Sequence, residues 1–214
     1  EAIIQGIAEA NRYPGSSRRD LTQALAQKHG VSEEGIVLGN GSTEILQMAV
    51  QAFMDPKLRL VSPIPTFEDV FEYSDPHPWV DVRAIPLLPD HSHDLTRMAE
   101  ESDGADGPVL VYVCNPNNPT GSLTPVKDVE AWIRTAGENV FFLVDEAYYE
   151  YVEAPDYPQT LEWLERNLAE GEPRWCDPVT GRGRAATDVA QAAQLRRQRS
   201  RHADTAANDR GGCG

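Results

Sequence analysis

Two short stretches decide the fold: Cys114-Asn115-Pro116-Asn117-Asn118-Pro119-Thr120-Gly121 and Asp145-Glu146-Ala147-Tyr148. The first follows the apolar run 109–113 and the second follows the apolar run 140–144, and each run has the length of a buried strand. In a parallel sheet, ligands collect outside the carboxyl ends of the strands. We therefore expect an amide, a carboxylate and a phenol to converge on one crevice.

The segments before these stretches alternate between helical and extended patterns. Helices are predicted over 17–28, 45–53, 67–73 and 125–136, and strands over 36–38, 58–61 and 80–87. Such alternation is typical of βαβ units. The predicted fold class is therefore α/β, a mainly parallel sheet with helices on both faces.

Composition narrows the class of protein. With 40% apolar and 25% charged residues, the chain has the make-up of a soluble globular protein, and no apolar run reaches the ~20 residues of a membrane span. The three cysteines have neither metal-site nor paired spacing, which favours a reducing compartment. A net charge of −15 argues against nucleic acid as a partner. We expect a cytoplasmic protein that does not bind membranes.

The last part of the chain differs from the rest. Residues 173–214 hold eight Arg and four Asp with no Lys or Glu, a charge of 8 − 4 = +4, so the remainder carries −15 − 4 = −19. The same residues contain no Ile, Phe, Tyr or Met. Such a segment buries too little apolar surface to offset its ordering entropy. We expect a partial ligand-binding domain over 1–172 and a disordered tail over 173–214.

A glycine-containing turn at Gly39-Asn40-Gly41-Ser42-Thr43 lies between a predicted strand and a predicted helix. Backbone N–H groups in such a turn, together with the helix N-terminus, can hold a phosphate group. The alternative is an ordinary strand-to-helix turn with a polar cap, because short glycine patterns recur by chance.

Asp145 ends an apolar strand, where a carboxylate is costly to desolvate without a cationic partner. The protonated nitrogen of a pyridine ring is such a partner, which suits pyridoxal phosphate. Phe67 could stack on that ring, and Asn118 and Tyr148 could bind its phenolic oxygen. The alternatives are a helix-capping role for Asp145 and a simple polar turn at Asn118. Phe67 could equally be a core aromatic, and Tyr148 a core or interface tyrosine.

Over about residues 1–170 the chain resembles the fold-type I pyridoxal-phosphate aminotransferases of class I/II, and it looks most like their histidinol-phosphate aminotransferase branch. The matching stretches are Asn11-Arg12-Tyr13-Pro14-Gly15, Gly39 to Ile45, Pro65-Thr66-Phe67, Asn115 to Gly121 and Asp145 to Tyr148. The resemblance implies a pyridoxal 5′-phosphate cofactor, an amino acid and a 2-oxo acid as substrates, and a homodimer with shared sites.

The same resemblance implies a role for each cofactor-binding residue. Gly41, Ser42 and Thr43 would hold the phosphate, and Phe67 would stack on the ring. Asn118 and Tyr148 would bind the ring oxygen, and Asp145 would pair with the ring nitrogen. Tyr13 would reach the phosphate in the neighbouring subunit.

The chain departs from the family in one respect that bears on catalysis. The family's Schiff-base lysine follows its Asp-Glu-Ala-Tyr motif, whereas the lysines here are Lys28, Lys57 and Lys127. We therefore assign no catalytic residue and expect the chain by itself to be inactive. The change of composition near Pro173 is what a truncated gene or a shifted reading frame would produce.

Other interpretations stay open on the sequence. A decarboxylase or lyase of the same fold would keep every cofactor contact, and a pseudoenzyme would bind the cofactor without catalysis. The arginine-rich run 196–201 could be a nucleic-acid-binding arm, although solvated disorder is the commoner meaning. His91 and His93, flanked by Asp90 and Asp94, lack a reliably placed further ligand, so we assign no metal.

Overall fold

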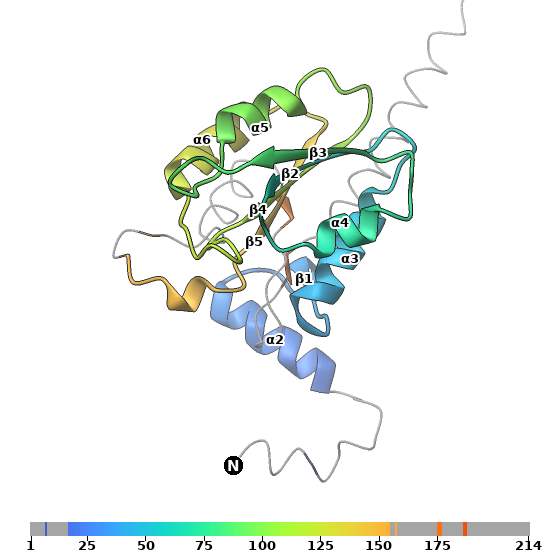
Figure 1. Ribbon diagram of the computed structural model, residues 1–214. Coiled ribbons are helices and arrows are strands. Elements are labelled where there is room, and N and C mark those ends of the chain that lie inside the picture. Colours follow the sequence, from blue (N-terminus) through green and yellow to red (C-terminus); the bar gives the residue numbers. More distant parts are fainter. Residues whose placement is uncertain (1–6, 8–16, 155–156, 158–174, 177–185, 188–214) are drawn as a thin grey trace, which may run out of the picture.

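The computed structural model describes residue 7, residues 17–154, residue 157 and residues 175–176 and 186–187 (Figure 1). The helices and strands, in chain order, are α2 (Ser17–His29), β1 (Ile36–Val37), α3 (Gly41–Phe53), β2 (Arg59–Ile64), α4 (Asp69–Ser74), β3 (Asp81–Pro86), α5 (Leu95–Ser102), β4 (Val109–Cys114), α6 (Val126–Thr135), β5 (Val140–Asp145), β6 (Trp175–Cys176) and β7 (Ala186–Thr187). Two single turns of 3₁₀ helix, η1 (Glu33–Gly35) and η2 (Tyr149–Tyr151), complete the set.

A parallel sheet in the order β3-β2-β4-β5-β6 forms the centre of the fold. β4 and β5 run in register over their whole length, so that Cys114 lies level with Asp145. β1 and β7 form a separate antiparallel pair. The α/β class and the mainly parallel sheet predicted from the sequence are confirmed.

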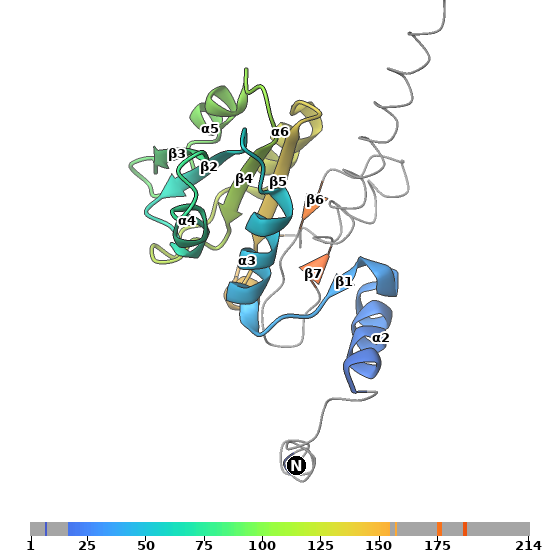
Figure 2. The same cartoon turned by 90° about the vertical axis from the view of Figure 1, so that its right-hand side faces the viewer.

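Helices cover both faces of this sheet (Figures 1 and 2), and every residue of the central strand β4 is therefore buried. On one face, α3 and α4 pack on Leu60, Leu110, Tyr112, Cys114 and Leu143. On the other face, α5 and α6 pack on the alternate residues of the same strands, which include Val61, Val111, Val113, Phe142 and Val144. Alternation along β5 places Asp145 on the same face as Leu143, toward α3 and α4.

The chain reverses its direction of travel across the sheet between β2 and β4. From β2 the connection runs through α4 to β3 at one edge, whereas from β4 it runs through α6 to β5 on the opposite side. Adjacent strands whose connections diverge in this way leave a crevice at their carboxyl ends. The loops at this crevice are 65–68, after β2, and 115–125, after β4.

Over residues 17–154, the bounds of the α-helices and strands agree with the sequence prediction to within a few residues, with one omission. Helix α5 was not predicted, although Asp94 marks its beginning: the Asp94 side chain is the N-cap and accepts a hydrogen bond from the Arg97 N–H at 3.0 Å. Pro125 lies at the N-cap of α6, one position before the expected first turn. Gly30, with φ 68°, follows the last residue of α2 as expected of a helix stop.

The stretch 173–214, for which we expect disorder, contributes β6 and β7, and its other residues lie outside the described part of the chain. Among the residues that are described, no helix is long and apolar enough to cross a bilayer.

Candidate functional site

A small cavity of about 30 Å³ lies at the carboxyl end of β5, on the α3 side of the sheet. It brings together five of the eight residues predicted to bind the cofactor, along with Cys114 and Ala147. Those five are Ser42, Phe67, Asn118, Asp145 and Tyr148. Gly41 and Thr43 flank Ser42 in the first turn of α3, and Tyr13 lies outside the described residues.

Asp145 is the charged centre of this cavity and is only 1% exposed. Its Oδ2 accepts a hydrogen bond from the Tyr112 hydroxyl at 3.0 Å, and its Oδ1 accepts one from the Ala147 N–H at 3.0 Å. Burial raises the pKa of Asp145 from 3.8 to about 6, against the lowering effect of these two hydrogen bonds. No ion pair to Asp145 is formed within the described part of the chain, so a cationic ligand group would complete its surroundings.

The glycine turn at the beginning of α3 reaches the cavity through Ser42. Gly41 has φ 81°, which favours glycine, and a Cβ at Gly39 would lie 2.6 Å from Ile45 Cδ1. Gly39 therefore lets the turn pack closely on α3. Asn40 is the N-cap but makes no side-chain hydrogen bond to the first turn, so this helix end keeps amide donors for an anion.

The three asparagines of the Asn-Pro loop differ in what they do. Buried Asn115 exchanges two hydrogen bonds with the backbone of Thr124, at 2.8 and 2.9 Å. Buried Asn117 donates to the Pro65 carbonyl at 3.1 Å and to Thr120 Oγ1 at 2.8 Å. The half-buried Asn118 side chain has no hydrogen-bond partner among the described residues, which leaves its amide to the cavity. Asn115 and Asn117 shape the loop, whereas Asn118 lines the cavity.

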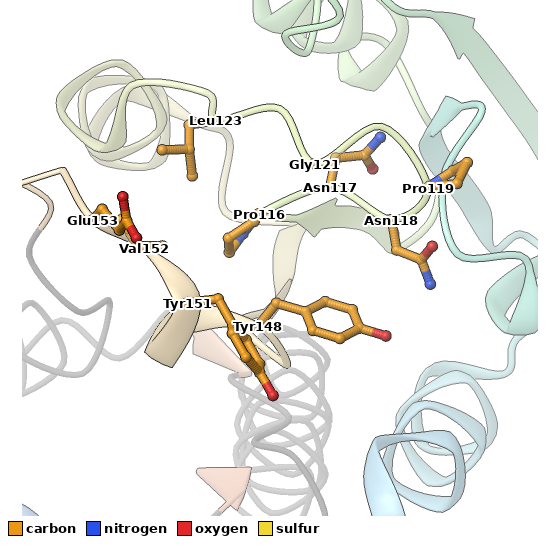
Figure 3. Close-up of a pocket in the computed structure, with 10 residues that line it drawn as sticks. All are labelled: Pro116, Asn117, Asn118, Pro119, Gly121, Leu123, Tyr148, Tyr151, Val152 and Glu153. Atoms are coloured by element: carbon orange, nitrogen blue, oxygen red, sulfur yellow. The ribbon is translucent and has the colours of Figure 1, made fainter.

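A larger cavity of about 450 Å³ lies next to the small one. Asn118 and Tyr148 line both cavities, and Figure 3 shows the Tyr148 phenol extending toward the side on which Asn118 lies. The remaining wall of the larger cavity comes from the Asn-Pro loop and from η2 with the two residues after it. Those residues are Pro116, Asn117, Pro119, Gly121, Leu123, Tyr151, Val152 and Glu153.

Several residues at the site were not singled out from the sequence. In the sequence, Tyr112 looks like one more member of the buried run 109–113. Its hydroxyl, in an otherwise apolar strand, is the feature that could have indicated a role at the site, because a buried tyrosine hydroxyl needs a hydrogen-bond partner. Thr66 joins the two crevice loops through a bond to Asn117 Oδ1 at 2.8 Å. That pairing joins positions far apart in the chain, so no local pattern reveals it.

His93, which the sequence brought up only as a metal ligand, is packed behind the Asn-Pro loop. Its backbone N–H donates to Thr124 Oγ1 at 2.9 Å, and its ring is 3% exposed. Burial lowers the pKa of His93 from 6.5 to about 4, and the Asn117 side chain opposes part of that shift. Across the described residues, no three His, Cys, Asp or Glu side chains come together as a metal site would require.

Comparison with known proteins gives a consistent result. The family model for aminotransferase class I and II matches residues 2–174. The histidinol-phosphate aminotransferase of Bacillus subtilis is 37% identical over 166 residues, which cover 78% of this chain and 45% of that protein. The chain thus spans less than half the length of this relative.

Solved structures agree. A protein of Erwinia carotovora atroseptica, provisionally assigned as a histidinol-phosphate aminotransferase, superposes with a TM-score of 0.75 at 30% identity, covering 82% of this chain and 49% of that one. The histidinol-phosphate aminotransferase of Sinorhizobium meliloti, solved in complex with pyridoxal-5′-phosphate, gives a TM-score of 0.72 at 26% identity, covering 84% and 46%.

Proposed function

Because the chain belongs to the class I and II aminotransferases, whose cofactor is pyridoxal phosphate, we propose that it is the cofactor-binding part of an enzyme that transfers an amino group from an amino compound to a 2-oxo acid. One observation carries the proposal: Ser42, at the beginning of α3, and Asp145, at the end of β5, line the same cavity. A set of residues that holds both the phosphate and the ring nitrogen of the cofactor must span the distance between these two groups.

The residues present suit the two ends of that molecule. Asp145 offers a buried carboxylate without an ion-pair partner in the described chain, which matches a protonated ring nitrogen. At the other end, the first turn of α3 offers the amides and hydroxyls of Ser42 and Thr43 beside Gly41, which match a phosphate. Between them, Phe67 would stack on the ring, and Asn118 and Tyr148 would donate hydrogen bonds to its phenolic oxygen.

The size of the cavity requires one side chain to move. A volume of about 30 Å³ suffices for a water molecule or two but not for a pyridine ring. Tyr148 lines both this cavity and the larger one and is 44% exposed, so its phenol has room to turn outward as the ring enters. The 450 Å³ cavity beyond it would then receive the amine substrate.

When bound, the cofactor supplies an electron sink for the carbanion that an amino acid forms on losing its α-proton. The residues of this chain position and polarise that sink: Asp145 keeps the ring nitrogen protonated, while Asn118 and Tyr148 favour the ionised ring oxygen. Proton transfer at the substrate needs a lysine in the family, and no lysine follows Asp145 here. We propose that the 214-residue chain by itself binds the cofactor noncovalently and does not catalyse transamination.

The names of the relatives suggest the substrate. We propose an amine of the histidinol-phosphate kind, with a 2-oxo acid as acceptor, and a cytoplasmic homodimer in which Tyr13 reaches the neighbouring site. Residues 1–172 would then be part of the large, cofactor-binding domain. Light scattering of the purified chain tests the dimer, and a monomer at micromolar concentration would contradict that part of the proposal.

The decisive experiment titrates the full 214-residue chain with pyridoxamine 5′-phosphate, followed by ring fluorescence. This compound keeps the ring and the phosphate but has no aldehyde, so surface lysines cannot react with it. We expect saturable binding at one site, weakened about tenfold or more by Asp145→Asn, because a charged partner is lost. The matched control is Asp106→Asn, which changes an exposed acid and should leave the affinity unchanged. Equal affinities for both variants, or no saturation, would refute the proposed site.

A further inference from the structure

Among the residues that the structure describes, the Tyr112 hydroxyl is the one side-chain group that donates a hydrogen bond to the Asp145 carboxylate. Tyr112 lies in the middle of β4 and is fully buried, and its hydroxyl reaches Asp145 Oδ2 at 3.0 Å. The contact follows from register, because Cys114 lies level with Asp145 and Tyr112 is on the same face of β4, two residues earlier. Since the Ala147 N–H binds Oδ1, each carboxylate oxygen accepts one bond from the protein.

Packing alone does not account for a tyrosine at this position. Tyr112 belongs to an apolar cluster that includes Leu46, Leu110 and Leu143, where phenylalanine would fill nearly the same volume. A hydroxyl group buried in such surroundings is costly unless it is hydrogen-bonded, and Asp145 is its partner. The hydroxyl therefore belongs to the site and not only to the core.

Of the described side chains that influence the pKa of Asp145, Tyr112 is the one that favours the ionised carboxylate. Burial disfavours the charged carboxylate, and so does the charge of Asp69 at the beginning of α4. Cys114, also on β4, is held protonated by burial, which raises its pKa to about 12. Burial likewise raises the pKa of Tyr112, so its hydroxyl keeps its proton and remains a donor.

We propose that Tyr112 is a positioning residue for the cofactor: its hydroxyl keeps Asp145 ionised and fixes Oδ2, so that the carboxylate meets the ring nitrogen as an oriented anion. The proposal rests on the proposed function for its consequence, while the effect of Tyr112 on Asp145 itself does not require the cofactor. If Tyr112 had only a structural role, replacing it would lower the stability of the fold by the same amount whether or not Asp145 was present.

The first measurement follows the Asp145 side-chain carboxyl carbon by NMR as the pH is varied, without cofactor. Tyr112→Phe should move the midpoint upward from about 6, because a hydrogen bond to the charged form is lost. The control is Tyr149→Phe, which removes a hydroxyl that donates to the Tyr157 carbonyl at 3.1 Å and should leave the midpoint unchanged. In the unmodified chain, the Tyr112 ring carbon bearing the hydroxyl should shift with the same midpoint as Asp145, a test that needs no variant.

The second measurement is a double-mutant cycle on affinity for pyridoxamine 5′-phosphate at pH 7.5. Tyr112→Phe should weaken binding about tenfold, but change it less than twofold when Asp145 is already asparagine. Equal weakening in both backgrounds would show a packing effect and overturn the proposal, as would an unchanged Asp145 midpoint. If no form of the chain binds the compound, the proposed function fails, and the Asp145 midpoint still decides the role of Tyr112.

Discussion

Thr66 Oγ1 donates a hydrogen bond to Asn117 Oδ1 at 2.8 Å, and both residues are buried. This bond joins the loop after β2 to the loop after β4, across the point where the chain reverses direction in the sheet. Phe67 and Asn118 are the next residues in these two loops, and both line the small cavity. The loops that carry this aromatic ring and this amide are thus joined behind the cavity by the Thr66 bond, together with the bond from Asn117 to the Pro65 carbonyl.

Thr66→Val tests this bond with little change in side-chain volume. Removing the hydroxyl leaves Asn117 Oδ1 buried without that donor, so we expect the free energy of unfolding to fall by about 1–3 kcal/mol. Urea denaturation followed by circular dichroism measures the change. Thr22→Val is the control, because the Thr22 hydroxyl binds the Arg18 carbonyl on an exposed face of α2; its effect should stay within about 0.5 kcal/mol. Equal effects of the two substitutions would assign no special role to the Thr66 bond.

Arg59 connects β2, β3 and α5 at the amino end of the strands, away from the cavity. Its side chain, 19% exposed, binds Asp81 Oδ2 at 2.8 Å and donates to the carbonyls of Glu101 and Asp103 at 3.0 and 3.2 Å. We expect Arg59→Met to lower the free energy of unfolding by about 1–3 kcal/mol, because bonds from a partly buried charged donor to β3 and to the end of α5 are lost.

The control for Arg59 is Arg134→Met. Arg134 pairs with Glu130 at 2.7 Å along α6, but its side chain is 48% exposed. A pair of this kind contributes about 0.5 kcal/mol or less. Thermal or urea denaturation of both variants separates the two cases, and a loss for Arg134→Met as large as that for Arg59→Met would contradict the assignment.

Much of the sheet was predictable because its signals are local. The runs 109–113 and 140–144 are apolar at every position, as strands buried on both faces must be, and the motifs after them placed Asn118 and Asp145 at one edge. Ser42 and Phe67 were expected at the same site and do line its cavity. The assignment of these residues to a cofactor stays a prediction.

The supporting contacts were not predictable, for a physical reason. Tyr112 meets Asp145, and Thr66 meets Asn117, through strand order and register, which no single stretch of sequence encodes. The short helix α5 was missed for another reason: its apolar positions are few, and Asp94 was considered only as a neighbour of His93. Burial of His93 depends on the Asn-Pro loop, which lies far from it in the sequence.

Asp145 makes stability depend on pH in a predictable direction. Its pKa is raised by burial from 3.8 in the unfolded chain to about 6 in the fold, so the folded state holds the extra proton between these values. This contribution to stability is present below pH 4 and is lost as the pH rises to 6, by about 3 kcal/mol in total. Asp145→Asn removes it.

The measurement is the difference in free energy of unfolding between Asp145→Asn and the unmodified chain, taken from pH 4 to pH 8 without cofactor. We expect the variant to gain relative stability between pH 4 and pH 6 and to keep a constant advantage above that. Asp106→Asn, at an exposed site, should show no such slope. A difference that is flat from pH 4 to pH 6 would mean that Asp145 is not buried as an uncompensated acid.

His93 makes the stability of the fold depend on pH over nearly the same range as Asp145, but in the opposite direction. Burial lowers its pKa from 6.5 to about 4, so the unfolded chain binds the proton more readily, and stability is lost as the pH falls through this interval. His93→Gln should therefore gain stability relative to the unmodified chain as the pH is lowered from 6.5 to 4, by up to about 3 kcal/mol. His77→Gln serves as the control outside the Asn-Pro loop.

Because the pH dependences of Asp145 and His93 oppose each other, the free energy of unfolding of the unmodified chain should vary little in this range. Each single variant should reveal the pH dependence that the other residue causes. Two variants that slope in the same direction would show that at least one of these groups is ionised differently from what its burial requires.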